Sequence, residues 1–149
     1  MVELTRKLLE MNGKKNDAYL RPVVYKSSQV VGVKLTGLED DFLLFATDMG
    51  NYLEVSKGLK VRVTSWKHVS DNSIPMRCKV NGAYANAALI KTEALDDGYD
   101  EAIVLTDDGH VSEGSAENIF LVRNGVLVTP PETDDILPGI TRDTVITLA

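Results

Sequence analysis

Hydrophobic and polar positions follow each other along the chain in blocks that predict helices and strands. Apolar residues recur at helical spacing over residues 2–12, and Gly13 then offers a stop, which predicts a short helix. Four runs rich in β-branched and aromatic residues predict strands, over residues 18–25, 30–37, 40–49 and 59–66.

The pattern changes in the second half. A stripe of small and apolar residues predicts a helix from Ala83 to Leu95, which ends at Gly98. Residues 101–114 read as two strands around a tight turn, and Asn124-Gly125 lies between two apolar runs, which predicts a hairpin. A last helix is expected to start at about Thr141.

The change of pattern also predicts two domains. Residues 67–77 are polar and contain Pro75, so we expect them to form an interdomain linker. Residues 1–66 and 78–149 would then be parts of two domains in an α+β chain. The last predicted helix has only about two turns, so we expect an incomplete polypeptide.

Composition and charge exclude several classes of function. The 149 residues carry a net charge of −6, which argues against a nucleic-acid partner. No apolar run approaches the ~20 residues of a membrane span. Cys78 is the only cysteine, so no internal disulfide can form, and a cytoplasmic location is expected. No metal site is expected, because neither His68 nor His110 has a second ligand at metal spacing; both are expected to be solvated or hydrogen-bonded.

Three polar features remain as candidates for chemistry. Lys79 precedes small residues that leave room for a flat ligand, and partial desolvation would make its amine a better nucleophile; a solvated lysine is the commoner alternative. Glu113 ends a predicted strand and could pair with a buried cation, or belong to a plain polar turn. Pro138 and Gly139 precede a helix start that suits a phosphate, although an ordinary start capped by Thr141 is commoner. An amine, a carboxylate and a phosphate site are the three groups that would bind the aldehyde, the ring nitrogen and the phosphate of pyridoxal phosphate.

The segments "EGSAENIF" and "LPGITR" carry a family resemblance. With them, residues 79–149 resemble the cofactor half of the fold-type IV pyridoxal-phosphate enzymes, specifically the branched-chain aminotransferases. Residues 4–25 resemble the end of that family's small N-terminal α/β domain. The resemblance implies a D-amino-acid-aminotransferase-like (fold-type IV) two-domain architecture, present here in part, with pyridoxal 5'-phosphate as cofactor. Residues 1–66 would be the C-terminal part of the small domain, and residues 78–149 the N-terminal part of the larger one.

By the same resemblance, Lys79 is the Schiff-base lysine and the acid-base catalyst. Tyr84 would hydrogen-bond the 3′-oxygen of the cofactor, Glu113 would pair with its pyridine nitrogen, and Leu137 would pack against the face of its ring.

The resemblance also implies a phosphate site and a supporting shell. The backbone amides of Ile140 and Thr141 would hold the phosphate, while Glu117 and Asn118 would support the residues that touch the cofactor.

Substrate recognition is expected in the first half of the chain. Tyr19 and Arg21 belong to "YLRP", which resembles the branched-chain members of the family. They would face the substrate side chain, and Arg21 would meet the second carboxylate of glutamate; a strand arginine paired at the surface is the alternative.

The implied activity is transfer of an amino group between Leu, Ile or Val and 2-oxoglutarate, in branched-chain amino acid biosynthesis, by a homodimer or higher oligomer. Two alternatives stay open. One is another fold-type IV enzyme, a D-amino-acid transaminase or aminodeoxychorismate lyase, and the other is a folded inactive fragment. Compared with the family, the chain lacks an opening segment with a phosphate-clamping arginine and a late C-terminal loop, so we expect impaired activity and weak cofactor binding.

Overall fold

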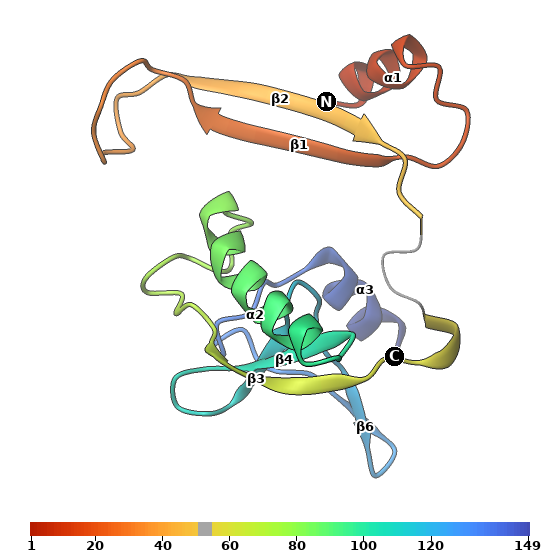
Figure 1. Cartoon of the computed structure of the whole chain (residues 1–149). Coiled ribbons are helices and arrows are strands. Elements are labelled where there is room, and N and C mark those ends of the chain that lie inside the picture. The colour runs from red at the N-terminus through yellow and green to blue at the C-terminus, as the bar shows by residue number, and fades with distance from the viewer. Residues whose placement is uncertain (51–54) are drawn as a thin grey trace. The chain divides into compact units, whose positions relative to one another are not determined.

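Residues 1–50 and 55–149 are described by the computed structural model. They fall into two units, Met1–Tyr52 and Leu53–Ala149, each with its own helices and strands (Figure 1). Helices and sheets occur in both units, so the predicted α+β class is confirmed.

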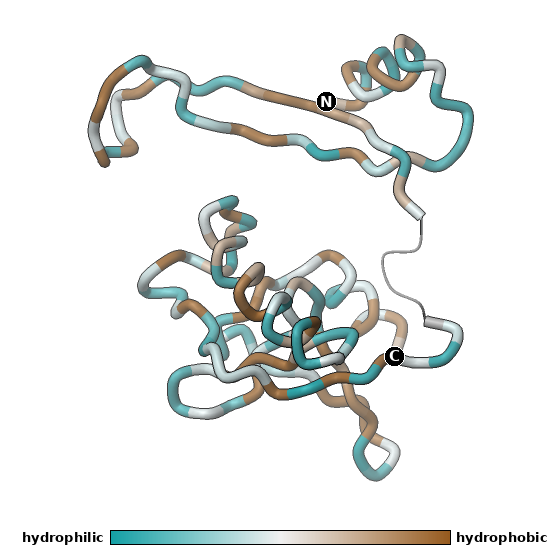
Figure 2. Tube along the Cα trace, viewed as in Figure 1, coloured by the Kyte–Doolittle hydropathy of each residue, from teal (hydrophilic) through white to brown (hydrophobic). Residues whose placement is uncertain are grey.

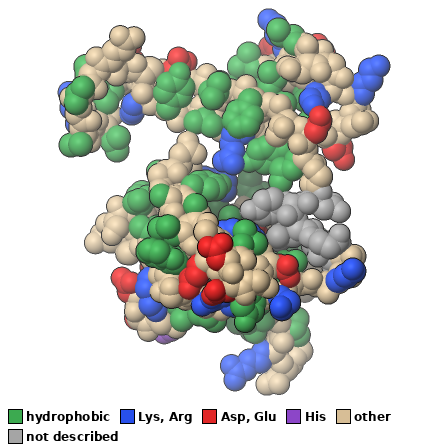
Figure 3. All heavy atoms as spheres, in the orientation of Figure 1, with side chains coloured by type: hydrophobic (Ala, Val, Ile, Leu, Met, Phe, Trp, Pro, Cys, Tyr) green, Lys and Arg blue, Asp and Glu red, His purple; other side chains and the backbone are tan. Residues whose placement is uncertain are grey.

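The first unit is a helix followed by a β-hairpin. α1 (Val2–Met11) confirms the predicted helix, and β1 (Tyr19–Lys26) pairs antiparallel with β2 (Asp40–Thr47) along its whole length. No residue among 1–50 is buried. Apolar side chains, among them Val24, Leu43 and Phe45, are therefore exposed on this unit. Figures 2 and 3 show hydrophobic residues along its hairpin and helix.

The strand predicted over residues 30–37 is wrong. The segment between β1 and β2 contains no strand, and the apolar side chains of Val31, Val33 and Leu35 are exposed. A strand needs a partner for its backbone groups and its side chains, and none of the described residues pairs with this segment. Gly37 has a φ of +67°, a left-handed conformation that interrupts extended backbone.

The second unit is built around a three-stranded sheet. β3 (Val61–Lys67) runs parallel to β4 (Glu101–Leu105), which pairs antiparallel with β5 (Val111–Gly114). α2 (Tyr84–Asp96) connects β3 to β4 and packs on the sheet (Figure 1). The buried apolar cluster between them is small and consists of Ile90, Ala94, Ala102 and Val104.

The structure moves the predicted boundary between domains. The division falls between Tyr52 and Leu53, not within residues 67–77. β3 belongs to the second unit because Val61 pairs with Glu101 and Val63 with Ile103 on β4. The polar residues 67–77 therefore lead from the end of β3 toward α2, inside one unit.

The remaining elements of the second unit are short. η1 (Val55–Lys57) precedes β3, and η2 (Asn81–Ala83) precedes α2. β6 (Leu121–Arg123) and β7 (Val126–Val128) form the predicted hairpin, and its turn residues Asn124 and Gly125 have φ values of 53° and 77°. α3 (Ile140–Leu148) begins one residue before the predicted start.

Candidate active site

A cleft in the second unit is lined by residues that are far apart in the sequence. His68 follows β3, Lys79 precedes α2, and Tyr84 is the first residue of α2. Glu113 lies in β5, and Leu137 belongs to the loop before α3. The cleft thus brings together the amine, the phenol, the carboxylate and the apolar side chain that the sequence predicts for one site.

Lys79 lies in the turn that leads into α2. Its Nζ atom is 5.7 Å from the centre of the Tyr84 ring, and Ala83 and Ala87 supply the small side chains that line the cleft beside it. The sequence predicted that the amine of Lys79 is partly desolvated. That prediction is wrong for this structure, because Lys79 is exposed. Its exposure follows from its position in a turn outside the apolar cluster.

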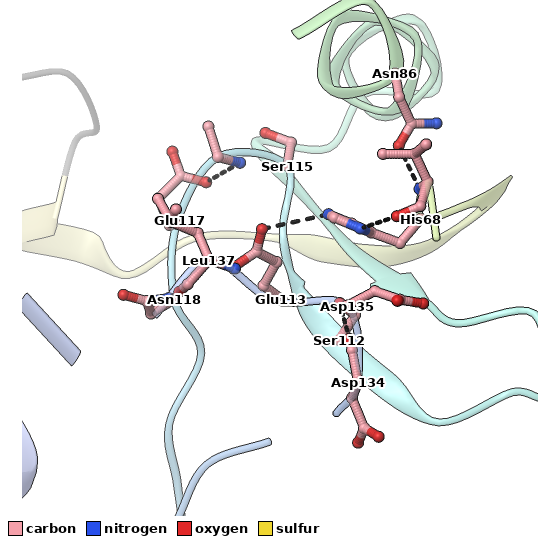
Figure 4. A network of polar contacts seen from close by, with 12 residues as sticks. His68, Asn86, Ser112, Glu113, Ser115, Glu117, Asn118, Asp134, Asp135 and Leu137 are labelled. Atoms are coloured by element: carbon pink, nitrogen blue, oxygen red, sulfur yellow. Dashed lines mark hydrogen bonds and ion pairs between the residues drawn. The ribbon is translucent and has the colours of Figure 1, made fainter. Parts of the chain in front are cut away.

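Glu113 is buried and held from two sides. Its Oε2 atom accepts the backbone N–H of Leu137 at 3.1 Å, and its Oε1 atom lies 3.3 Å from Nε2 of His68 (Figure 4). A carboxylate fixed in this way is a ready partner for a cationic group in the cleft.

His68 is a site residue that the sequence analysis did not select. Its side chain is buried, and Nδ1 lies 3.2 Å from the carbonyl oxygen of Val69. Asn86 on α2 anchors this segment, since its Oδ1 accepts the Val69 N–H at 3.2 Å and its Nδ2 donates to Lys67 O at 3.0 Å. The only sequence signal was its place directly after a strand. His110, by contrast, is exposed.

The loop after β5 is fixed by its own polar groups. Glu117 accepts the Ala116 N–H at 3.0 Å through Oε2, and its backbone carbonyl accepts the Gly114 N–H at 2.7 Å. The hydroxyl of Ser115, buried at the cleft, has no hydrogen-bond partner among the described residues. A buried hydroxyl without a partner is costly, so this site suits a polar ligand.

Asn118 connects this loop to the segment before α3. Its Nδ2 donates to the carbonyl oxygen of Leu137 at 2.9 Å. Its Oδ1 lies so close to Gly139 that a Cβ atom on this glycine would be 2.5 Å from it. Gly139 is therefore required by close packing, and the role of Asn118 in supporting the cofactor site stays a prediction.

Two carboxylates of the second unit, Glu101 and Glu117, have pKa values shifted in opposite directions. Burial raises the pKa of Glu101, but hydrogen bonds from Lys91 and the Ala102 N–H, with the charge of Lys91, lower it by more, so the net shift is downward. Burial raises the pKa of Glu117, the Ala116 N–H opposes this, and the charge of Glu101 raises the pKa further.

The phosphate-binding feature predicted from sequence lies next to the cleft. A second cleft is lined by Gly139, Ile140 and Thr141 and shares Lys79 and Leu137 with the first. α3 has Gly139 as its N-cap without a side-chain cap, so Thr141 does not have the capping role of the alternative interpretation. Within residues 55–149, the backbone N–H groups of Ile140 and Thr141 donate to no protein acceptor.

Tyr19 and Arg21 belong to the first unit. Both lie on β1, with the Arg21 guanidinium carbon 5.5 Å from the centre of the Tyr19 ring. Their role toward a substrate stays a prediction.

Comparison with known proteins decides the family. A family model described as amino-transferase class IV matches residues 1–149. This chain belongs to the class IV aminotransferases. The chain is 47% identical over 148 residues to a probable branched-chain-amino-acid aminotransferase of Aquifex aeolicus, covering 99% of this chain and 48% of that protein.

Solved structures of other class IV aminotransferases have the same fold. The branched-chain aminotransferase of Thermoproteus uzoniensis with norvaline has a TM-score of 0.93 at 44% identity, over 99% of this chain and 49% of that one. The branched-chain amino acid aminotransferase of Thermobaculum terrenum in its PLP-form (holo-form) has a TM-score of 0.89 at 33% identity, over 99% and 48%. The predicted fold-type IV architecture is confirmed, and the chain spans about half the length of these relatives.

The parts of the chain that the structure describes contain no cluster of three or more metal-ligating side chains. They also contain no helix with the length and apolar character needed to cross a bilayer.

Proposed function

We propose that this chain is the part of a branched-chain aminotransferase that holds pyridoxal 5'-phosphate. One observation carries the proposal: two adjoining clefts share Lys79 and Leu137, with buried Glu113 on one side and the free amides of Ile140 and Thr141 on the other. An aldehyde, a ring nitrogen and a phosphate need those three kinds of group.

The residues present fit this cofactor. Ser115 offers a buried hydroxyl without a partner among the described residues, and Glu113 is a buried carboxylate already oriented by the Leu137 N–H. The amides of Ile140 and Thr141, at the N-terminus of α3, favour an anion through their hydrogen atoms and the helix dipole. These groups lie on rigid elements or on loops that are hydrogen-bonded to them.

Each residue then has a defined task. When bound, the cofactor supplies a carbon that receives the amino group and a ring that accepts electrons. Lys79 would hold the aldehyde and later move the proton from Cα of the substrate. Tyr84 would donate to the ring oxygen, Glu113 would keep the ring nitrogen protonated, and Leu137 would cover the ring face.

The substrates proposed for the whole enzyme are a branched-chain L-amino acid and 2-oxoglutarate, with Tyr19 and Arg21 on the substrate side. The names of the relatives support this choice over a D-amino-acid transaminase or a lyase. We further propose that the whole enzyme is a cytoplasmic homodimer or higher oligomer; a folded inactive fragment remains the rival for the isolated chain.

Borohydride reduction in the presence of pyridoxal phosphate tests the site. Peptide mapping should find the phosphopyridoxyl group on Lys79, because no other lysine lines either cleft within residues 55–149. The Lys79→Ala variant should fold and take no specific label. Preferential label on Lys34, Lys67 or Lys91 of the unaltered chain would contradict the assignment.

A further inference from the structure

The second cleft contains a basic side chain to which the proposed function gives no task. Arg77 lines this cleft together with Gly139, Ile140 and Thr141, at the start of α3. Among the residues that the structure describes, it is absent from the lining of the first cleft, where Glu113 lies. Arg77 therefore belongs to the end of the site that would hold the phosphate, and not to the end that would hold the ring.

The charges around the second cleft leave an anion short of positive charge unless Arg77 takes part. Within residues 55–149, the charged side chains that line this cleft are those of Arg77, Lys79 and Glu117. Lys79 would be committed to the aldehyde, and Glu117 is acidic. The start of α3 supplies roughly half an elementary charge, whereas a phosphate monoester carries about −1.5 to −2 near neutral pH. An arginine does not lose its proton in proteins, so Arg77 offers this cleft a permanent cation.

The guanidinium of Arg77 has hydrogen-bond donors left over for a ligand. Its Nη1 atom forms an ion pair with the carboxylate of Asp71. An arginine has five N–H donors in one plane, and within the described part of the chain those on Nε and Nη2 donate to no protein acceptor. The Arg77 side chain is also 66% exposed, so it can turn toward the cleft without displacing packed neighbours. It can therefore keep Asp71 and bind an anion at the same time.

Asp71 ties Arg77 to the loop before α3 through two hydrogen bonds that involve the backbone. Its Oδ1 atom accepts the backbone N–H of Arg77 at 3.2 Å. Its own backbone N–H donates to Oδ1 of Asp135 at 2.8 Å, and Asp135 lies in the loop that leads to α3. The segment that carries Arg77 is thus connected to the loop that positions the amides of Ile140 and Thr141.

We propose that Arg77 is a binding residue for the phosphate group, beside the amides of Ile140 and Thr141. The inference rests on the proposed function, and it adds a side chain where the sequence predicted backbone amides alone. A guanidinium binds phosphate oxygens through charge-assisted hydrogen bonds, which are shorter and stronger than those of a neutral donor. Arg77 lies two residues before Lys79, so one short segment would bind both the phosphate and the aldehyde.

Comparison of pyridoxal phosphate with pyridoxal, which has the same ring and aldehyde but no phosphate, tests this contact. The dissociation constant of each compound is measured by spectroscopic titration of the unaltered chain and of Arg77→Gln. Because Arg77 is largely exposed, we expect Arg77→Gln to weaken binding of pyridoxal phosphate by about three- to tenfold. Binding of pyridoxal should change by less than about twofold. An equal loss for both compounds, or no loss for either, would overturn the proposal.

Three matched variants separate the cation from other effects. Arg77→Lys should recover part of the affinity, because it keeps the charge but not the planar fork. Asp71→Asn removes the same ion pair yet retains an Oδ1 acceptor for the Arg77 N–H, so binding of pyridoxal phosphate should not fall. Arg123→Gln removes a positive charge from an exposed position outside both clefts and should have less effect than Arg77→Gln. A loss in Asp71→Asn or Arg123→Gln as large as that in Arg77→Gln would contradict a direct contact.

Inorganic phosphate provides a measurement that does not depend on the aldehyde. At millimolar concentrations its ³¹P signal should broaden more in the presence of the unaltered chain than in the presence of Arg77→Gln. Equal broadening with both chains, or none with the unaltered chain, would overturn the role of Arg77. Failure of pyridoxal phosphate to label Lys79 would instead count against the proposed function, while the phosphate signal would still decide the role of Arg77.

Discussion

The partly buried ion pair between Lys91 and Glu101 should contribute measurably to the stability of the second unit. The Lys91 ammonium lies 2.6 Å from Oε2 of Glu101, with exposed fractions of only 21% and 7% for the two side chains. Lys91 also donates to the Asp100 carbonyl at 2.7 Å. Replacing Lys91 by Met keeps most of the volume and removes both interactions, so the carboxylate of Glu101 is left without its cation.

The expected loss of stability can be bounded from the contacts. Breaking a buried ion pair by removing one partner costs about 3–5 kcal/mol. Glu101 keeps two N–H donors, from Ala102 at 2.8 Å and Ser115 at 3.3 Å, and Lys91 is about one-fifth exposed. We therefore expect the free energy of unfolding to fall by about 2–3 kcal/mol in Lys91→Met, below the full buried-pair value.

The pH dependence of stability provides a second test of this prediction. The pKa of Glu101 is lowered in the folded chain, so its contribution to stability is present above the ordinary value of 4.5 and is lost as the pH falls through the folded pKa. Without Lys91, Glu101 can take up a proton more easily. The difference between Lys91→Met and the unaltered chain should therefore be largest near neutral pH and shrink as the pH falls toward that ordinary value.

Urea unfolding of the full chain, followed by circular dichroism at several pH values, measures this difference. Glu132→Gln is a control in the same unit, because Glu132 is 68% exposed and lies 3.8 Å from Arg142. This surface change should cost less than about 1 kcal/mol. If Lys91→Met costs no more than Glu132→Gln at neutral pH, the ion pair does not stabilise the fold as argued.

Three further substitutions have expected outcomes. The pKa of Glu117 is raised in the folded chain, so its charged form destabilises the fold at neutral pH. Glu117→Gln should therefore raise the free energy of unfolding, measured in urea at neutral pH, by about 0.5–1.5 kcal/mol. This increase in stability should vanish in mild acid, where the carboxyl group is protonated in both states. Gly139→Ala should cost about 1 kcal/mol in the same urea assay by displacing Asn118, and the cost should largely disappear in an Asn118→Ala background if the two residues are coupled as their contact indicates. Gly98→Ala should lower the melting temperature, at a cost of about 1 kcal/mol, by straining the left-handed residue after α2, whereas Gly82→Ala, outside the left-handed region and facing open space, should cost less.

Local signals in the sequence predicted the local elements well. The hairpin at Asn124-Gly125 was predictable because its turn needs positive φ at both residues, which these residue types tolerate. The helix from Ala83 was predictable from its stripe of small residues, and Gly98 from its place at the end of that stripe. In such elements the interactions that fix the structure lie within a few residues.

Several of the predictions that failed depended on residues that are distant in the sequence. β3 was assigned to the first domain because its parallel partner, β4, comes about 40 residues later in the chain. Residues 30–37 have the composition of a strand but, among the described residues, no strand to pair with. His68 was not selected because Glu113, the residue that gives it a role, belongs to a different strand. Composition alone contains no information on such pairings.

The candidate site is held in shape mainly by polar contacts, because the apolar cluster of the second unit is small. The loop before α3 forms no strand, yet three of its residues are bound by other segments: the Asp134 carbonyl accepts the Ser112 hydroxyl at 2.6 Å, Asp135 accepts the Asp71 N–H at 2.8 Å, and Leu137 binds Glu113. A change in any of these contacts acts on the direction of Glu113 and on the start of α3 together. Substitutions in this loop should therefore weaken cofactor binding even where they touch neither the ring nor the phosphate site.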